Sequence, residues 1–311
     1  MKAHQSTYCV GSRLAQCSPY STVRGALVTM ADEKRNYLRL TNLIARWLVC
    51  DNVQVFAIRR DQRIGSSNCM ITGTAATAID MEDLPDDALN LQNLLEKIEL
   101  QERKNLTLEV ILQDTDWTHL ELVTTLHILD ILIQFVPSLV GYVDDVQDLF
   151  NTEACKHQIN PKRKSTVHPL GTNSANEVST QGMFEAMVDF LEQIGTSEET
   201  LGNRIQFFSG DGKSFEAVGK VKKYLSSQNG NFKSMAFIVE VLELWHTEWH
   251  DLGRICSTLW GPPHTNDPST LGYLAKAINS PTPSDFKKVD FYHNSRLVDV
   301  AVKAHVLQCW E

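Results

Sequence analysis

Apolar and polar residues alternate with two different periods along this chain, and the mixture predicts an α/β protein. The stretch "EKRNYLRLTNLIARWL" (33–48) repeats apolar residues at nearly helical spacing and predicts an amphipathic helix. It leads into "VCDNVQVF" (49–56), which is rich in β-branched residues and predicts a strand with an aspartate in its middle. The Thr-, Ile- and Ala-rich "SNCMITGTAATAI" (67–79) predicts a second strand or the second arm of a hairpin.

A long helical stretch separates these strands from the next one. From about 88 to 150 the apolar spacing is helical, and "TQGMFEAMVDFLEQIG" (180–195) predicts another helix after a polar loop. "RIQFF" (204–208) then predicts a short buried strand, followed by a tight turn and a helix over about 214–226. Residues 234–259 predict a longer helix, or a strand followed by a helix.

The same patterns predict one folded domain behind a loose N-terminal segment. Residues 1–30 lack apolar periodicity, which predicts disorder. Residues 31–311 are expected to form a single α/β domain with a large helical insertion at about 85–200. The last segment, "SRLVDVAVKAHVLQCWE", is periodic to its final residue, so the domain is expected to be truncated at the C-terminus.

Composition narrows the class of protein. Of 311 residues, 42% are apolar and 22% are charged, which is typical of a soluble globular protein. The net charge of −9 argues against a surface that binds nucleic acid throughout, while a local basic groove remains compatible with it. Seven cysteines without a CxxC pair predict reduced thiols inside a cell. The most apolar run (120–136) is too short to span a bilayer and carries two acids, so it predicts a core helix and no membrane partner.

The stretch "FFSGDGKS" allows three interpretations of Asp211: part of a phosphate-binding loop, a metal-binding carboxylate, or an ordinary turn residue. A Walker A loop needs a glycine where this chain has Phe207. A dinucleotide-binding GxGxxG motif needs a glycine where the chain has Phe215. No nucleotide cofactor is therefore predicted.

Two further motifs have simple structural explanations. "WHTEWH" puts His246 and His250 four residues apart on one helix face, a spacing that suits metal ligands. Zinc-protease helices place a glutamate directly beside one histidine, whereas Glu248 is central here, so surface or capping histidines are the simpler interpretation. The basic "PKRK" (161–164) is compatible with nuclear localisation or a phosphate contact, and a solvated loop explains it more simply.

Two carboxylates remain as candidates for chemistry. Asp51 lies inside the strand predicted at 49–56, and Asp211 follows the strand predicted at 204–208. A site for two Mg²⁺ ions needs hard oxygen ligands held rigidly, and strands fix the positions of side chains better than loops do. Asp51 and Asp211 are therefore candidate magnesium ligands, and a turn aspartate flanked by glycines is the alternative for Asp211.

Seven segments occur in order along the chain: "CDNVQVFAIRRDQRIG", "TGTAATAI", "VHPLGTNSANEVSTQGMFEAMVDFL", "FFSGDGKSF", "FKSMAFIVEVLELWHTEWHDLGRI", "LWGPPHTNDPSTLGYLAKAI" and "KKVDFYHNSRLVDVAVKAHVLQCW". Together they resemble a large family of uncharacterised proteins, expanded in mushroom-forming fungi and known only as a domain of unknown function. The resemblance covers roughly residues 45–310. The layout is similar to that of transposase-type RNase H folds, with a first aspartate on the opening strand and a Gly-Asp turn after a later strand.

The resemblance implies an RNase H-like mixed sheet interrupted by the helical insertion, and it assigns roles to particular residues. Asp51 takes the place of the first metal-binding aspartate, Asp211 that of the second, and His246 that of a histidine on a following helix. Glu248, 37 residues after Asp211, is the candidate third catalytic acid. Three further acids are alternatives for that role: Asp267, Asp290 and Asp299.

The turn itself departs from the pattern it resembles. Mutator-like transposases often have GDxLT there, whereas this chain has Lys213 and Ser214 in the last two positions, and a lysine places positive charge beside the candidate ligand. The resemblance thus implies a degenerate transposase-derived protein that, if active, cuts or joins DNA strands with Mg²⁺. The alternative is a catalytically inactive nucleic-acid-binding or protein-interaction scaffold.

Overall fold

The computed structural model describes the chain in five stretches: residues 19–58, 67–82, 84–85, 87–156 and 162–311. It divides the chain into two compact units, whereas the sequence predicted a single domain. The first unit comprises the described residues of Met1–Glu96 and Ser165–Glu243, and the second comprises those of Lys97–Lys164 and Leu244–Glu311. The first unit contains the sheet, and the second is helical in its described part.

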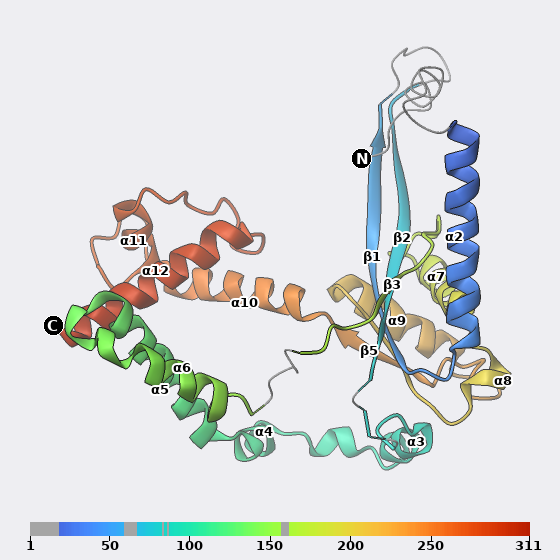
Figure 1. The fold of residues 1–311 in the computed structure, drawn as a ribbon, viewed down its shortest axis with the longest axis horizontal. Coiled ribbons are helices and arrows are strands. Elements are labelled where there is room, and N and C mark those ends of the chain that lie inside the picture. The colour runs from blue at the N-terminus through green and yellow to red at the C-terminus, as the bar shows by residue number, and fades with distance from the viewer. Residues whose placement is uncertain (1–18, 59–66, 83, 86, 157–161) are drawn as a thin grey trace. The chain divides into compact units, whose positions relative to one another are not determined.

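The first unit is built on a five-stranded mixed sheet in the order β3-β2-β1-β4-β5 (Figure 1). β2 is antiparallel to both β1 and β3, whereas β1, β4 and β5 run parallel to one another. The strands are, in chain order, β1 (Arg46–Ala57), β2 (Cys69–Asp80), β3 (Val167–Pro169), β4 (Gln206–Gly210) and β5 (Ile238–Leu242). The predicted α/β class is confirmed, and so are the strands predicted at 49–56, 67–79 and 204–208, to within a few residues at their ends.

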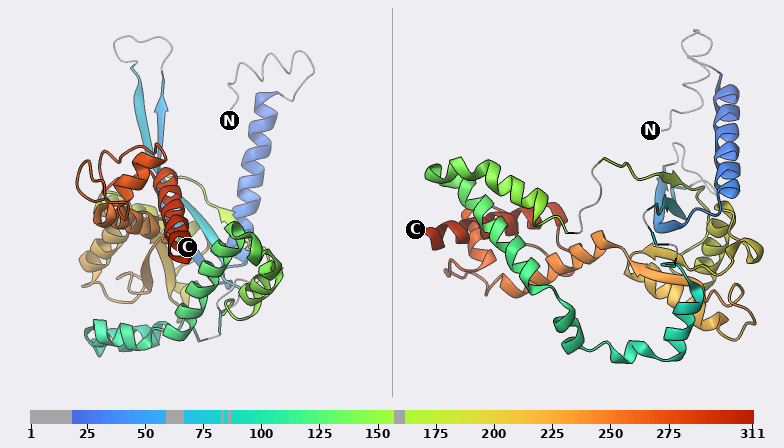
Figure 2. Two further views of the ribbon diagram at one scale, coloured as in Figure 1. Left: turned by 90° about the vertical axis from the view of Figure 1, so that its left-hand side faces the viewer. Right: turned by 60° about the horizontal axis from the view of Figure 1, so that its bottom comes forward.

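β1 and β2 continue beyond the rest of the sheet as a two-stranded ribbon. They form a hairpin and pair along all 12 residues of each strand. β4 pairs only with Trp47–Val49 of β1, and β3 pairs only with Thr77–Ile79 of β2. The outer part of the hairpin therefore lacks neighbouring strands within the described residues, and Figures 1 and 2 show it projecting from the sheet.

Helices of the first unit follow the sequence predictions only in part. They are α2 (Tyr20–Leu40), α3 (Leu91–Glu99, which runs into the second unit), α7 (Thr180–Gln193), α8 (Glu198–Leu201) and α9 (Gly212–Leu225). Residues 20–30 are helical rather than disordered, and residues 1–18 lie outside the described residues. The helix predicted over 33–48 ends at Leu40, because Arg46–Leu48 belong to β1, where Leu48 is fully buried.

The core of this unit lies between one face of the sheet and the helices α7 and α9. Successive strand residues point to opposite faces, so in β1 the fully buried Leu48 and Cys50 alternate with half-buried neighbours. α7 and α9 pack against each other, and α9 also contacts β4 and β5. The core includes these buried residues of the strands and the two helices: Leu48, Cys50, Ala76, Ala78, Met183, Ala186, Met187, Phe190, Phe208, Val218, Val221 and Ile238.

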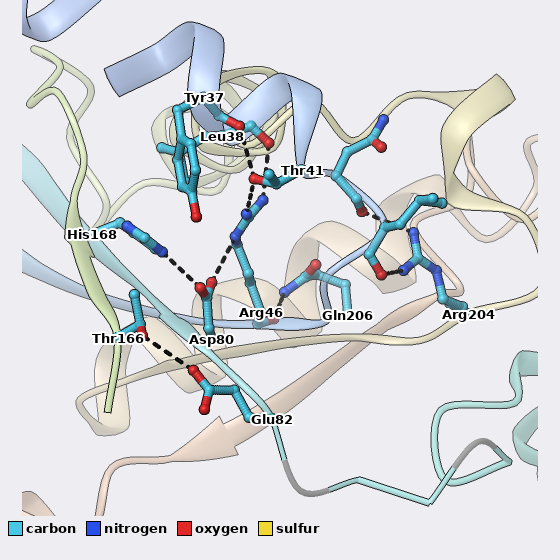
Figure 3. Close-up of polar contacts among 12 residues, drawn as sticks. Tyr37, Leu38, Thr41, Arg46, Asp80, Glu82, Thr166, His168, Arg204 and Gln206 are labelled. Carbon is cyan, nitrogen blue, oxygen red and sulfur yellow. Dashed lines mark hydrogen bonds and ion pairs between the residues drawn. The ribbon is translucent and has the colours of Figure 1, made fainter. Parts of the chain in front are cut away.

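A buried ion pair connects the three antiparallel strands to the end of α2 (Figure 3). Nε of Arg46 lies 2.9 Å from Oδ1 of Asp80, and both side chains are at most 5% exposed. Arg46 also donates to the carbonyl oxygen of Leu38 at 3.0 Å and to Oγ1 of Thr41 at 2.5 Å, where α2 ends. On β3, Nε2 of His168 lies 2.9 Å from the other carboxylate oxygen of Asp80. The guanidinium and the carboxylate are thus each satisfied from more than one element.

The second unit is a set of helices around a separate core. They are η1 (Glu102–Asn105), α4 (Leu108–Asp114), α5 (Trp117–Phe135), η2 (Pro137–Tyr142), α6 (Val143–Thr152), α10 (Leu244–Leu259), α11 (Leu271–Ala277) and α12 (Phe291–Trp310). Buried residues of its core are Leu252, Cys256, Leu271, Ala275, Val289, Leu297 and Ala301. β5 followed by α10 accounts for residues 234–259, as one of the two predicted alternatives.

The helical insertion is shorter than the predicted range of 85–200. Helices follow β2 as far as α6, and β3 then returns to the sheet at Val167–Pro169 before α7 begins. α5 contains the most apolar run of the sequence and buries Leu126, Ile131, Leu132 and Ile133. No helix in the described part of the chain is long and apolar enough to cross a membrane.

Asp80→Asn is expected to lower the free energy of unfolding by about 3–5 kcal/mol, because it leaves the buried Arg46 guanidinium without a counter-charge. Chemical denaturation followed by circular dichroism measures this change. Asp32→Asn is the matched control, since it removes an exposed ion pair to Arg35 within α2 and is expected to leave stability nearly unchanged. Similar effects of the two substitutions would contradict the role assigned to the buried pair.

Candidate functional site

The register between β1 and β4 brings the two predicted aspartates to the same edge of the sheet. The two strands are parallel, and Val49 pairs with Ser209. Asp51 and Asp211 each follow two residues later, Asp51 within β1 and Asp211 directly after β4. Because parallel neighbours advance in the same direction at nearly the same rise per residue, both aspartates come to the same level of the sheet.

Asp211 also begins helix α9. Its Oδ1 accepts a hydrogen bond from the backbone N–H of Ser214 at 2.7 Å, which is the geometry of a helix N-cap. Gly210 is required by close packing, since a Cβ there would lie 2.7 Å from Cβ of Ser214 and 3.0 Å from the carbonyl oxygen of Cys50. A Cβ on Gly212 would meet nothing within 4 Å. The turn is therefore a tight strand-to-helix connection in which one carboxylate oxygen of Asp211 is engaged in the cap.

A third acid, Glu177, belongs to the same cluster of charge. It lies in the loop before α7 and is 4% exposed. Burial raises its pKa most, the charges of Asp211 and Asp51 raise it further, and a hydrogen bond with Asn52 lowers it, so that the pKa is about 7. Its Oε2 has no hydrogen-bond partner in the described part of the chain. The fold thus brings a buried, incompletely satisfied carboxylate within electrostatic reach of both predicted aspartates.

The loop that carries Glu177 is anchored on β2. Thr74 pairs with Asn173 in an isolated antiparallel bridge, and Oγ1 of Thr74 donates to the carbonyl oxygen of Ala175 at 2.9 Å. Gly73 makes this approach possible, since a Cβ there would lie 2.4 Å from the carbonyl oxygen of Asn173. Thr74 is also the partner of Asn52 on β1. The loop therefore crosses β2 opposite the residue that follows Asp51.

The same loop is anchored on α7. A Cβ on Gly182 would lie 2.1 Å from the carbonyl oxygen of Asn176, so only glycine permits this contact without a shift of the backbone. Ser179 caps the helix by accepting a hydrogen bond from the N–H of Gly182 at 3.0 Å. Nδ2 of Asn173 donates to Oδ2 of Asp189 at 2.9 Å. These contacts explain why the sequence "GTNSANEVSTQG" consists largely of glycine and short polar residues.

Cys50 is affected by the same acids. Burial raises the pKa of its thiol, and the charges of Glu177, Asp51 and Asp211 raise it further, in that order. The side chain therefore stays a neutral thiol near pH 7, and it lacks the thiolate character that a nucleophilic cysteine needs. Its position supports the view that three carboxylates surround one region, which is not itself a cysteine site.

The three acids have the chemistry of a Mg²⁺ site, although they do not form a closed set of ligands. Carboxylate oxygens are the ligands that Mg²⁺ prefers, and Oε2 of Glu177 is buried without a partner in the described part of the chain. Among the described residues, no group of three or more His, Cys, Asp or Glu side chains is arranged to hold a metal ion. Binding would therefore require the carboxylates to move closer together.

The other predicted site residues lie in the second unit. Glu248 and His246 are on α10, where Glu248 is exposed and the His246 ring lies 4.8 Å from the Trp245 ring between centroids. The three alternative acids have local partners: Asp267 binds Ser269, Asp290 caps α12, and Asp299 pairs with Lys303. Of the basic tetrad, Pro161 lies outside the described residues. Lys213, which follows the Gly-Asp turn, is exposed.

Glu177 was not predicted from the sequence as a site residue. The acid stands just before a predicted helix and after a loop rich in glycine and asparagine, which is the available local signal. Its link to Asp51 depends on the bridge between Thr74 and Asn173, residues almost a hundred positions apart in the chain. Such a pairing is not visible in local periodicity, so the third acid was sought on α10 instead.

Comparison with known proteins gives one match. Residues 101–311 match a family of unknown function, DUF6589, whose match includes Glu177 and Asp211 and begins after Asp51. No curated protein and no solved structure matches the chain. The matched residues make up more than half of the sequence, and the predicted resemblance to a domain of unknown function is confirmed to that extent. The chain therefore belongs to the family of unknown function DUF6589.

Proposed function

We propose that this chain is a transposase-derived protein that cleaves or transfers DNA strands with Mg²⁺ at Asp51, Asp211 and Glu177. The observation that carries the proposal is the electrostatic state of Glu177. Its pKa of about 7 results from burial and from the negative charges of Asp211 and Asp51. A cation among the three carboxylates would relieve this repulsion, and for the described part of the chain the structure offers no other counter-charge to Oε2 of Glu177.

The donor set fits a hard divalent cation. Asp51 and Asp211 would hold the metal from adjacent strands, and Glu177 would approach it from the loop before α7. Bound Mg²⁺ would polarise a phosphoryl oxygen and lower the pKa of an attacking water molecule. The protein's own part is to hold two carboxylates rigidly on β1 and β4 and to keep a third one desolvated, where its electrostatic effect is large.

The order of the strands supports an RNase H-like assignment of the sheet. β1 is central, with antiparallel β2 on one side and parallel β4 on the other. Asp51 is on β1, and the Gly-Asp turn containing Asp211 follows β4 directly. This is the layout that the resemblance to transposase-type folds implies, with a first aspartate on the opening strand and a second after a later strand.

Glu177 is a better candidate than Glu248 for the third acid. Glu177 belongs to the first unit, and both aspartates act on its pKa. Glu248 is exposed on α10 in the second unit, and no interaction in the structure connects it to Asp51 or Asp211 among the described residues. We therefore assign the third role to the loop residue.

A catalytically inactive scaffold that binds nucleic acid or protein is the second candidate function. It is favoured by the cap on α9, which already occupies Oδ1 of Asp211. It is also favoured by the arrangement of the acids, since no metal-binding group of three is present among the described residues. In this alternative the aspartates serve the fold alone, and cleavage would not depend on them.

Asp51→Asn, Asp211→Asn and Glu177→Gln are each expected to lower Mg²⁺-dependent cleavage of single- and double-stranded DNA by about 100-fold or more, as is typical when one preorganised electrostatic contact is removed from an active site. Asn at 211 remains a good N-cap, so α9 is preserved. A labelled-oligonucleotide gel assay with and without EDTA measures the loss.

Glu248→Gln is the matched control and is expected to keep wild-type activity. Loss of cleavage in this variant with normal activity of Glu177→Gln would transfer the third role to Glu248. Absence of Mg²⁺-dependent cleavage in the wild type on every DNA substrate would favour the scaffold.

Glu177→Gln is expected to raise the melting temperature by a few degrees at pH 8, and by less at pH 5. The pKa of Glu177 is raised from 4.5 to about 7 in the folded protein, so folding binds a proton between these values. The wild type therefore loses stability as the pH rises from about 4.5 to about 7, and the Gln variant lacks this loss. Differential scanning fluorimetry across this range measures the difference.

Mg²⁺ is expected to restore the lost stability of the wild type at pH 8 and to affect Glu177→Gln much less, because bound cation stabilises the folded state. Ca²⁺ and an equal ionic strength of NaCl are the controls. An identical effect of Mg²⁺ on both proteins would argue against a metal held by Glu177.

A further inference from the structure

An aromatic cluster occupies the start of α10 and of α12 in the second unit. The ring of Trp245 lies 5.4 Å from that of Trp249 and 5.7 Å from that of Phe291, between centroids. Phe291 in turn packs edge-on against Tyr292 at 5.7 Å, and His246 lies 4.8 Å from Trp245. These five residues, termed the aromatic platform, come from two helices far apart in sequence.

The aromatic platform is fixed from below and open above. Nε1 of Trp249 donates to the carbonyl oxygen of the buried Val289 at 2.7 Å, which fixes this half-buried ring against the loop before α12. Trp245 is 42% exposed and Tyr292 is 79% exposed. Leu244, just before Trp245, is 76% exposed. Large aromatic side chains that are held in place yet left in solvent are typical of surfaces that bind a ligand.

Charge beside the aromatic platform is positive on the loop and negative on α10. Lys287 and Lys288 are exposed, directly precede Val289, and form no ion pair within the described part of the chain. The nearby acids of the loop are engaged: Asp285 accepts the N–H of Lys287, and Asp290 caps α12 and pairs with His293. Glu248, one helical turn after Trp245, is exposed and is the acid expected to oppose an anionic ligand.

We infer that the aromatic platform binds unpaired bases of single-stranded nucleic acid, with Trp245 and Tyr292 stacking on the bases and Lys287 and Lys288 contacting the phosphates. Stacking on exposed aromatic rings together with basic side chains is the chemistry by which proteins hold single strands. A duplex hides the faces of its bases, so it offers the rings no surface to stack on. The inference rests on the proposed function, because it names the form of DNA on which that site would act.

The position of the platform along the chain agrees with such a role. α10 begins at Leu244, one residue after Glu243, whose backbone N–H donates to the carbonyl oxygen of Gly210 at 3.1 Å. Gly210 directly precedes Asp211. The chain therefore leads from the strand next to the Gly-Asp turn into the first residues of the platform.

The test is a binding measurement that does not need catalysis. The full chain carrying Asp51→Asn is titrated in EDTA, at low salt, against three fluorescein-labelled probes: dT20, an abasic 20-mer with the same phosphates, and a 20-base-pair duplex. Fluorescence anisotropy is expected to show dT20 bound about tenfold more tightly than the abasic strand, as one base–aromatic stack contributes. Equal binding of dT20 and the abasic strand would overturn the inference.

Trp245→Ala is expected to weaken binding of dT20 about tenfold and to leave binding of the abasic strand unchanged. Trp310→Ala is the matched control, since Trp310 is 55% exposed and lies outside the platform, and it is expected to bind like the parent. Lys287→Ala with Lys288→Ala is expected to weaken both strands and to reduce the salt dependence. Parent-like binding of dT20 by Trp245→Ala, or a change in its sedimentation that shows the platform to be a contact between copies, would overturn the inference.

Glu248 gives a result of opposite sign. Glu248→Gln is expected to tighten dT20 binding severalfold, because it removes a negative charge beside the platform. Since all binding is measured without Mg²⁺, a platform that fails to bind single strands would overturn this inference alone. Loss of the proposed cleavage site would instead appear as Mg²⁺-independent stability and activity, with strand binding intact.

Discussion

The parallel register between β1 and β4 is the constraint on which the candidate site depends. Pairing of Val49 with Ser209 places Asp51 and Asp211 at one level, and a shift of one residue would send one of the two side chains to the opposite face. The register is supported by burial of Leu48 and Phe208 on the core side of the sheet. Two carboxylates thus share an edge because two apolar residues pair correctly one turn of pleat earlier.

Placing a third acid there opposes folding, and the structure contains devices that hold it in place nonetheless. Glu177 is buried beside two negative charges, and its pKa rises to about 7 as a result. The loop that carries it is held by backbone contacts at Gly73 and Gly182 that leave no room for a side chain. A loop held this tightly keeps its acid near the aspartates even though their repulsion favours its withdrawal.

The parts of this arrangement that could be predicted are the local ones. Period-2 burial revealed β1, β2 and β4, and their ends pointed to Asp51 and Asp211, because strand ends are where parallel neighbours meet. Glu177 could not be found in this way, since it reaches the site through the pairing of Thr74 with Asn173. The helix from Tyr20 was missed for a related reason, because α2 is stabilised by α7 and by the buried Arg46 rather than by a strong pattern of its own.

Whether the acids serve chemistry or only the fold can be argued from how each is satisfied. Asp211 has a structural role as the cap of α9, and Asp51 is exposed, so neither alone requires a ligand. Glu177 differs, because Oε2 is buried and receives no hydrogen bond from the described residues. An amide or an apolar side chain at this position would avoid the repulsion, whereas a carboxylate gains there only when a cation is present. The buried oxygen of Glu177 is therefore the feature that the scaffold alternative leaves without a physical explanation.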